Sequence, residues 1–230
     1  MKSQNINDVS AFPGPRILIV RHGATADNQK KGTAGDVVRG QSNHPLTSVG
    51  VKEAKDRGER LKDAGIVELY CSPLVRALVT AREIGGPIGL KPRKKKELLP
   101  WDMGEFTGMS AVIAKPLLRQ YAEDHPMVPV KGGESFAAWK KRLIGWIRKL
   151  MQHVEGQGIT VCCVTHSRCI KLIEGWVKTG TDNPKIDFDL EFRDNTEPGG
   201  IYDFRPSPSG KWSIHQLDKG YVVKGDSGVG

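Results

Sequence analysis

The chain has 230 residues, and its 35 Lys and Arg against 26 Asp and Glu give a formal net charge of +9. That length suits one α/β domain, and 38% apolar with 27% charged residues is typical of a soluble globular protein. No apolar run is long enough to cross a membrane, and the N-terminus carries no apolar signal segment, so we expect a cytoplasmic protein. The positive charge raises the question of a phosphate or nucleic-acid partner.

Short apolar runs alternate with helical patterns along the chain, which predicts an α/β protein. We expect a polar arm over 1–15, a single domain over 16–218 and a flexible tail over 219–230. The predicted strands are 16–20, 66–72, 159–164 and a terminal hairpin of 200–205 and 211–215. The predicted helices are 47–64, one from Pro73 that ends at Gly85-Gly86-Pro87, 111–122, 136–154 and 167–178. Residues 29–45 have no period and are expected to form a loop. The predicted fold is a three-layer sandwich with a central, mostly parallel sheet flanked by helices.

The four cysteines are Cys71, Cys162, Cys163 and Cys169, and none forms a C-x-x-C pair. We expect them to be reduced and buried as small hydrophobic residues, which fits a reducing cytoplasm. Cys162 and Cys163 are neighbours in a predicted strand, so their side chains should point to opposite faces of the sheet.

Three of the predicted strands end in polar residues of similar chemistry. These ends are Arg21-His22-Gly23, Cys71-Ser72-Pro73 leading to Arg76, and Thr165-His166-Ser167. Functional sites of open α/β sheets gather at the carboxyl ends of the strands. If the three strands are neighbours, two arginines and two histidines converge on one place.

Such a cluster suits the chemistry of a phosphoryl group. A guanidinium offers a planar fork of donors to a phosphate dianion, and positive neighbours keep an imidazole neutral and therefore nucleophilic. The cluster brings no thiolate or carboxylate to hold a metal, so we expect neither a metal nor a cofactor. The residues predict phosphoryl transfer to a histidine.

The same residues belong to segments that resemble the histidine phosphatase superfamily, also called phosphoglycerate mutase-like. The segments are ILIVRHGATADN (17–28), GQSNHPLTSVG (40–50), LYCSPLVRALVTA (69–81), GGESFAAWKKRL (132–143), VCCVTHSRCIKLI (161–173) and NTEPGGIYDF (195–204). They follow the family's order, and the resemblance implies the phosphoglycerate mutase-like fold.

The resemblance also implies roles for individual residues. His22 is the nucleophile that becomes phosphohistidine, and Arg21, Arg76 and His166 bind the phosphoryl group. The substrate-binding residues expected beside them are Gly23, Thr25 and Asn28. Glu134 matches a recurrent family residue to which no chemistry is assigned.

Two departures from the family pattern affect the site. In LLPWDMGEFTG (98–108), Pro100 stands where the family often has its glutamate general acid. We therefore expect Asp102 to act as the acid, with Glu105 as the second candidate, although a loop carboxylate can also serve only to cap the next helix. Arg168 stands where the family commonly has glycine after the second histidine, and it adds a positive charge that can contact substrate.

The favoured function is a phosphomonoester hydrolase acting on a small phosphorylated substrate. A phosphoglycerate mutase is the alternative, although the stretch 91–131 offers only a basic loop and one helix to shield a phosphohistidine from water. A basic nucleic-acid-binding protein with a lapsed site, using KPRKKK (91–96), is less favoured because no aromatic residues interleave with the lysines. The oligomeric state is not readable, although a dimer is compatible with the sequence.

Overall fold

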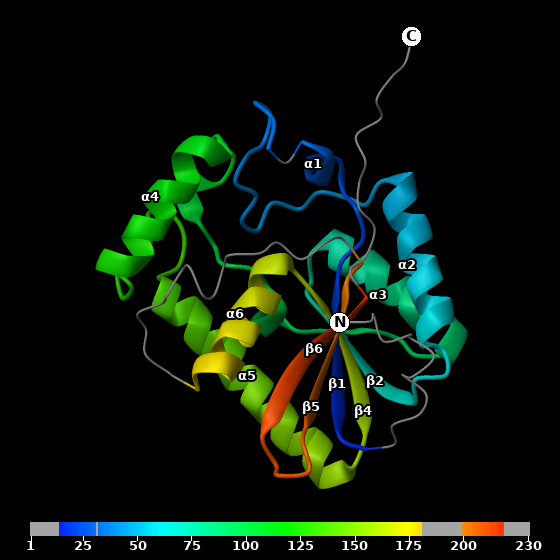
Figure 1. Cartoon of the computed structure of the whole chain (residues 1–230). Helices are drawn as coiled ribbons and strands as arrows, with labels where there is room; N and C mark the ends of the chain where they lie inside the picture. Colours follow the sequence, from blue (N-terminus) through cyan, green and yellow to red (C-terminus); the bar gives the residue numbers. More distant parts are fainter. Residues whose placement is uncertain (1–13, 31, 181–198, 219–230) are drawn as a thin grey trace.

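The computed structural model describes residues 14–30, 32–180 and 199–218, so the tail and almost all of the expected N-terminal arm lie outside the described residues. A six-stranded sheet in the order β3-β2-β4-β1-β5-β6 forms the centre (Figure 1). Its strands are β1 (Arg16–Arg21), β2 (Ile66–Cys71), β3 (Arg93–Lys94), β4 (Thr160–Thr165), β5 (Ile201–Pro206) and β6 (Trp212–Asp218). The strands β3, β2, β4 and β1 are parallel, whereas β5 runs antiparallel to both of its neighbours.

Helices cover both faces of this sheet, as the predicted three-layer sandwich requires. They are α1 (Ala26–Gln29), α2 (Ser48–Leu61), α3 (Val75–Ile88), α4 (Ala111–Asp124), α5 (Phe136–Gln157) and α6 (Ser167–Thr179), with short 3-10 helices at Lys96–Leu98 and Gly104–Phe106. The helices α2 and α3 pack on one face of the sheet, and α5 and α6 pack on the other (Figure 1).

Alternating residues of a strand contribute to the hydrophobic core on opposite faces of the sheet. In β1, Ile17 and Ile19 belong to the core half beneath α5, whereas Leu18 belongs to the half beneath α2 and α3. Cys163 and Cys162 divide in the same way, which confirms that they point to opposite faces. All four cysteines are buried and free of disulfides, as the sequence predicts.

Most predicted elements are present, but one helix ends later than expected. The structure continues α3 through Gly85, Gly86 and Pro87 and ends it at Gly89, which adopts the left-handed conformation. The prediction that Gly85-Gly86-Pro87 ends the helix was therefore wrong. A methyl group at Gly85 would lie 2.1 Å from the carbonyl oxygen of Leu90, so this glycine permits close packing rather than ending the helix.

The segment 29–45, predicted to be a loop, is held by backbone hydrogen bonds to residues 109–111. Val38 N–H donates to the carbonyl of Met109 at 2.9 Å, and Ala111 N–H donates to the carbonyl of Asp36 at 2.8 Å. These bonds hold residues 36–38 against the start of α4.

The parallel strands place their carboxyl ends at one end of the sheet. Arg21 of β1 pairs with Thr165 of β4, and Cys71 of β2 pairs with Val164. The ladder continues one residue further, because His22 N–H donates to the carbonyl of Thr165 at 3.1 Å. In the described ranges, no helix combines the length and the apolar character that crossing a membrane requires.

Candidate active site

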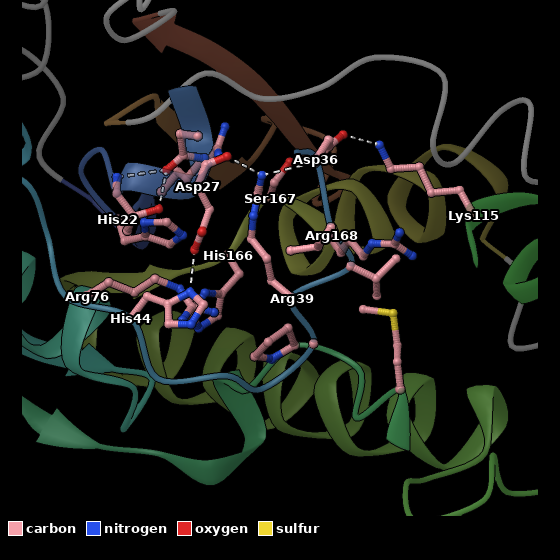
Figure 2. A pocket seen from close by; sticks show the side chains of 18 residues that line it. His22, Asp27, Asp36, Arg39, His44, Arg76, Lys115, His166, Ser167 and Arg168 are labelled. Atoms are coloured by element: carbon pink, nitrogen blue, oxygen red, sulfur yellow. Dashed lines mark hydrogen bonds and ion pairs between the residues drawn. The ribbon is translucent and has the colours of Figure 1, made fainter. Parts of the chain in front are cut away.

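A pocket of about 160 Å³ opens at the carboxyl ends of β1, β2 and β4 (Figure 2). Arg21 and His22 follow from β1, Arg76 comes from the first turn of α3 after β2, and His166 follows β4. All four side chains line this pocket and are buried. The structure therefore brings together the four residues on which the sequence prediction depends.

The His22 ring is fixed through one of its nitrogens. Nδ1 lies 2.8 Å from the carbonyl oxygen of Gly23, which can only accept a hydrogen bond, so Nδ1 carries the proton. Nε2 then holds the free electron pair. Burial, followed by the charges of Arg76 and Arg21, holds the pKa of His22 well below its usual value. The ring is therefore held in its neutral form.

His166 lies beside His22, with 5.2 Å between the ring centroids. Its Nε2 is 2.8 Å from Ser72 Oγ, while its buried Nδ1 has no hydrogen-bond partner among the residues that the structure describes. Burial and the charge of Arg76 hold the pKa of His166 well below its usual value. A buried nitrogen without a partner is costly, so Nδ1 is suited to meet an oxygen of a bound anion.

Arginine side chains surround the two rings. Arg76 donates from Nη1 to the carbonyl of Ser42 at 2.6 Å. Burial and the neighbouring charge of Arg39 lower the pKa of Arg76 to about 10, so it remains charged at neutral pH. Arg39 also acts on His22, and burial and Arg39 together lower the pKa of Arg168 to about 10. Like charges held this close favour the binding of an anion.

Backbone contacts fix the loop that carries His22. A methyl group at Gly23 would lie 2.4 Å from the carbonyl oxygen of Gly50, so only glycine allows the loop to meet the start of α2. Gly23 N–H donates to Thr80 Oγ1 at 3.0 Å, and Ala24 N–H donates to Glu53 Oε2 at 2.8 Å. Gly23 therefore acts through the backbone and does not line the pocket.

Thr25 and Asn28 form hydrogen bonds with each other in the turn that begins α1. Asn28 Oδ1 accepts from Thr25 N–H at 2.9 Å and from Thr25 Oγ1 at 2.8 Å. Both residues line the pocket, as expected. These bonds fold the start of α1 around the site.

The two acids predicted from the 98–108 segment lie outside the pocket lining. Asp102 Oδ1 accepts from Gly104 N–H at 3.2 Å, so its carboxylate is bound to the backbone of the loop that carries it. Glu105 is exposed, and Pro100, which stands at the family's acid position, does line the pocket. Glu134 anchors this segment, because its Oε1 accepts from Asp102 N–H at 3.1 Å and from Arg142 Nη2 at 2.7 Å.

Sequence reasoning did not select five ionisable residues that line the pocket: Asp27, Asp36, Arg39, His44 and Lys115. Arg39 and Lys115 both donate to the Asp36 carboxylate, at 3.2 and 3.0 Å. Burial raises the pKa of Asp36, but the hydrogen bonds from Lys115 and Gly32 outweigh it and leave that pKa below its usual value. Asp27 pairs with His44 (Figure 2). Asp27 and His44 lie within the segments ILIVRHGATADN and GQSNHPLTSVG, which were the available signals, whereas Asp36 and Arg39 lie in an unpatterned stretch.

The remaining predicted features divide between the pocket and the surface. Arg168 lines the pocket, as expected. No residue of the basic run 91–96 lines it. Over the described ranges, no three His, Cys, Asp or Glu side chains are grouped so that they could hold a metal ion.

Comparison with known proteins identifies the family of this fold and site. The family model described as the histidine phosphatase superfamily (branch 1) matches residues 17–196. The sequence is 26% identical over 159 residues to phosphoserine phosphatase 1 of Hydrogenobacter thermophilus, covering 66% of this chain and 71% of that protein. It is 35% identical over 89 residues to a probable phosphoglycerate mutase of Yersinia enterocolitica, a match that covers 39% of each chain. The chain thus spans about two fifths of the length of the mutase relatives that it matches.

Solved structures support the fold assignment. A mycobacterial glucosyl-3-phosphoglycerate phosphatase superposes with a TM-score of 0.69 at 20% identity, covering 89% of this chain and 98% of that one. The α-ribazole phosphatase of Shigella flexneri gives a TM-score of 0.69 at 18% identity, covering 91% and 99%. At these identities the similarity shows a common fold.

Proposed function

Because this chain belongs to the histidine phosphatase superfamily, branch 1, we propose that it hydrolyses small phosphomonoesters through a phosphohistidine at His22. The observation that carries the proposal is the convergence of two neutral imidazoles and two guanidiniums in one pocket at the ends of β1, β2 and β4. Phosphatases among the relatives and the solved structures with the same fold support this class of reaction.

In the proposed first step, His22 Nε2 attacks the phosphorus and the bond to the leaving oxygen breaks. Arg21 and Arg76 neutralise the charge on the transferring group, and His166 Nδ1 donates to one of its oxygens when the proton lies on that nitrogen. A water molecule then attacks the phosphohistidine, releasing inorganic phosphate and restoring the neutral ring.

The substrate-facing roles follow from the pocket walls. We propose that Arg168, together with Arg39, meets the rest of the substrate, while Thr25 and Asn28 shape the turn beside the phosphoryl group. The reaction needs no cofactor. Four free, buried cysteines favour a reducing compartment such as the cytoplasm.

Replacing His22 with alanine tests the proposal. We expect His22→Ala to lose phosphate release from nitrophenyl phosphate and to lose the acid-labile phosphoprotein that forms during turnover. His153→Ala is the matched control, because His153 is exposed and does not line the pocket. Full turnover by His22→Ala would refute the proposed mechanism.

Phosphoglycerate mutase activity is the second candidate function, and the partial match to mutase sequences favours it. A mutase would isomerise phosphoglycerate with little release of phosphate, whereas a hydrolase releases phosphate from generic esters without a bisphosphate activator. A substrate screen that follows both products decides between them. The nucleic-acid alternative is disfavoured because the basic run lies outside the pocket lining.

A further inference from the structure

An alkoxide leaving group needs a proton, and the expected source of that proton does not reach the pocket. Pro100 stands on the pocket wall and has no proton to give. The Asp102 carboxylate accepts from Gly104 N–H, and neither Asp102 nor Glu105 lines the pocket. Among the described residues, another part of the lining must therefore supply the acid, if the reaction proceeds as proposed above.

The described residues add further ionisable groups to the lining besides the phosphoryl-binding set. Asp36 is held ionised by Lys115 and Arg39, and the Lys115 ammonium is itself bound to Asp36. The remaining candidate is the pair that Asp27 and His44 form. We propose that His44 is the general acid of this site and that Asp27 is its positioning residue.

The loop that carries His44 is fixed to the phosphoryl-binding helix. Asn43 Oδ1 accepts from Val75 N–H at 2.7 Å, and Arg76 Nη1 donates to the carbonyl of Ser42 at 2.6 Å. His44 is the next residue along this loop. These contacts hold the His44 loop against the helix of Arg76, the proposed phosphoryl ligand, and His44 and Arg76 line the same pocket.

The Asp27 contact orients the imidazole. Asp27 Oδ2 bonds to His44 Nδ1, so Nε2 is the ring nitrogen that can meet a leaving group (Figure 2). Asp27 is also close enough to Arg76 for its charge to act on that guanidinium. The His44 side chain lines the pocket and is about half exposed, at 47%, so it is accessible both to a bound ester and to solvent. A histidine oriented by a carboxylate is a common proton donor in enzymes.

His22, His44 and water account for every bond and proton of the proposed reaction. His22 Nε2 forms the bond to phosphorus as the bond to the leaving oxygen breaks, and that oxygen takes the proton from His44 Nε2. The products are an alcohol, a phosphohistidine and a neutral His44. Water then attacks the phosphorus and gives a proton to His44 Nε2, which releases phosphate and restores the starting state.

The dependence of rate on the leaving group tests the assignment. The probes are ring-substituted phenyl phosphates, from 4-nitrophenyl phosphate, whose phenolate leaves without a proton, to unsubstituted phenyl phosphate. We expect His44→Gln to lower kcat/KM for phenyl phosphate by roughly 10²-fold, and to lower it far less for the nitrophenyl ester. Added imidazole should restore part of the phenyl phosphate rate to His44→Ala.

Asp27 is tested as a positioning residue by the same series. Asp27→Asn should steepen the leaving-group dependence in the same direction as His44→Gln, by a smaller factor, and Asp27→Glu should restore part of the loss. A purely structural role would lower the rates of all esters alike.

The control is His153→Gln, which removes another exposed histidine paired with a carboxylate, Glu68, outside the pocket lining. It should leave the leaving-group dependence as it is. Equal losses on every ester in His44→Gln would overturn the assignment, as would a steepened dependence in Asp102→Asn with none in His44→Gln. These results leave phosphohistidine labelling intact, whereas failure of the proposed function appears as turnover by His22→Ala.

Discussion

At the scale of single residues, the site depends on keeping two buried histidines neutral. Burial and the arginine charges push the pKa of both His22 and His166 in the same direction, well below the usual range. The neutral form suits a nucleophile and also has a consequence for the stability of the folded protein.

We expect the protein to lose stability as the pH falls. An unfolded imidazole binds a proton below about pH 6.5, whereas the buried rings do not, so the unfolded state binds more protons in that range. The free energy of unfolding should therefore decrease from about pH 7 to about pH 5 and level off only below the lowered pKa values of the folded state.

Thermal unfolding of the parent protein and of His22→Asn and His166→Asn checks this expectation. Each variant lacks one of the two buried rings, so its Tm should fall less over the same pH interval. Parallel Tm curves for all three proteins would contradict the assignment of neutral buried histidines.

The residue scale also shows where sequence reasoning reached its limit. Strand-end chemistry located Arg21, His22, Arg76 and His166, because parallel strands share one edge. The orientation of the Asp102 carboxylate could not be predicted in this way, because the sequence gives the position of Asp102 along the chain and not the direction of its side chain. That direction is set by a hydrogen bond to Gly104, two residues along its own loop.

At the scale of elements, the loop after β1 is held by two helices at once. Gly23 contacts α2 at Gly50 and α3 at Thr80, and the fit is close in both directions, since a methyl group at Gly50 would lie 2.1 Å from the carbonyl oxygen of Ala24. The position of His22 is therefore determined by how closely these backbones approach.

Gly50→Ala should displace this contact. We expect a loss of roughly 1–3 kcal/mol in the free energy of unfolding, together with a reduced kcat, because the clash is with backbone and no side chain can move aside. Denaturant unfolding and phosphate release measure the two effects.

Gly145→Ala in α5 is the matched control. A methyl group at Gly145 meets nothing within 4 Å, so this substitution should stabilise the helix by up to about 1 kcal/mol and keep activity. Similar destabilisation by both substitutions would show that close approach at Gly50 is not the cause.

Helices and strands could be predicted wherever the sequence pattern lay within the element itself. The side chains of Thr47 and Ser135 accept hydrogen bonds from Gly50 N–H and Ala138 N–H and so cap α2 and α5, two helices that the sequence predicts. The pairing of Val37 with Ser110 could not be predicted, because its partners lie more than 70 residues apart and neither has a strand pattern.

At the scale of the whole molecule, the charge of +9 has more than one origin. Arg21, Arg39, Arg76 and Arg168 lie in the pocket, whereas the basic run 91–96 includes β3 at the edge of the sheet. Charged side chains on an edge strand discourage pairing with another chain, so this run has a structural use that needs no ligand. The same charges also contribute to the field that an approaching anion meets.

Varying the salt concentration should distinguish the effect of this electrostatic field from direct contact between the lysines and the substrate. We expect kcat/KM for a phosphomonoester to fall as ionic strength rises from about 0.01 M to about 0.5 M, since screening shortens the reach of the field. A variant with Lys91→Gln and Lys94→Gln should be slower than the parent at low salt and equal to it at high salt. A difference that persists at high salt would indicate that these lysines contact the substrate.

The pocket has two walls of different construction. The strand ends supply Arg21, His22 and His166, and backbone contacts hold them in place, whereas the other wall comes from the connecting segments that carry 36–40, Pro100 and Met103, and from Lys115 of α4. Substitutions in the second wall leave the backbone contacts of the strand ends in place. Exchanging its segments can thus change which molecules the pocket accepts while Arg21, His22 and His166 keep their positions.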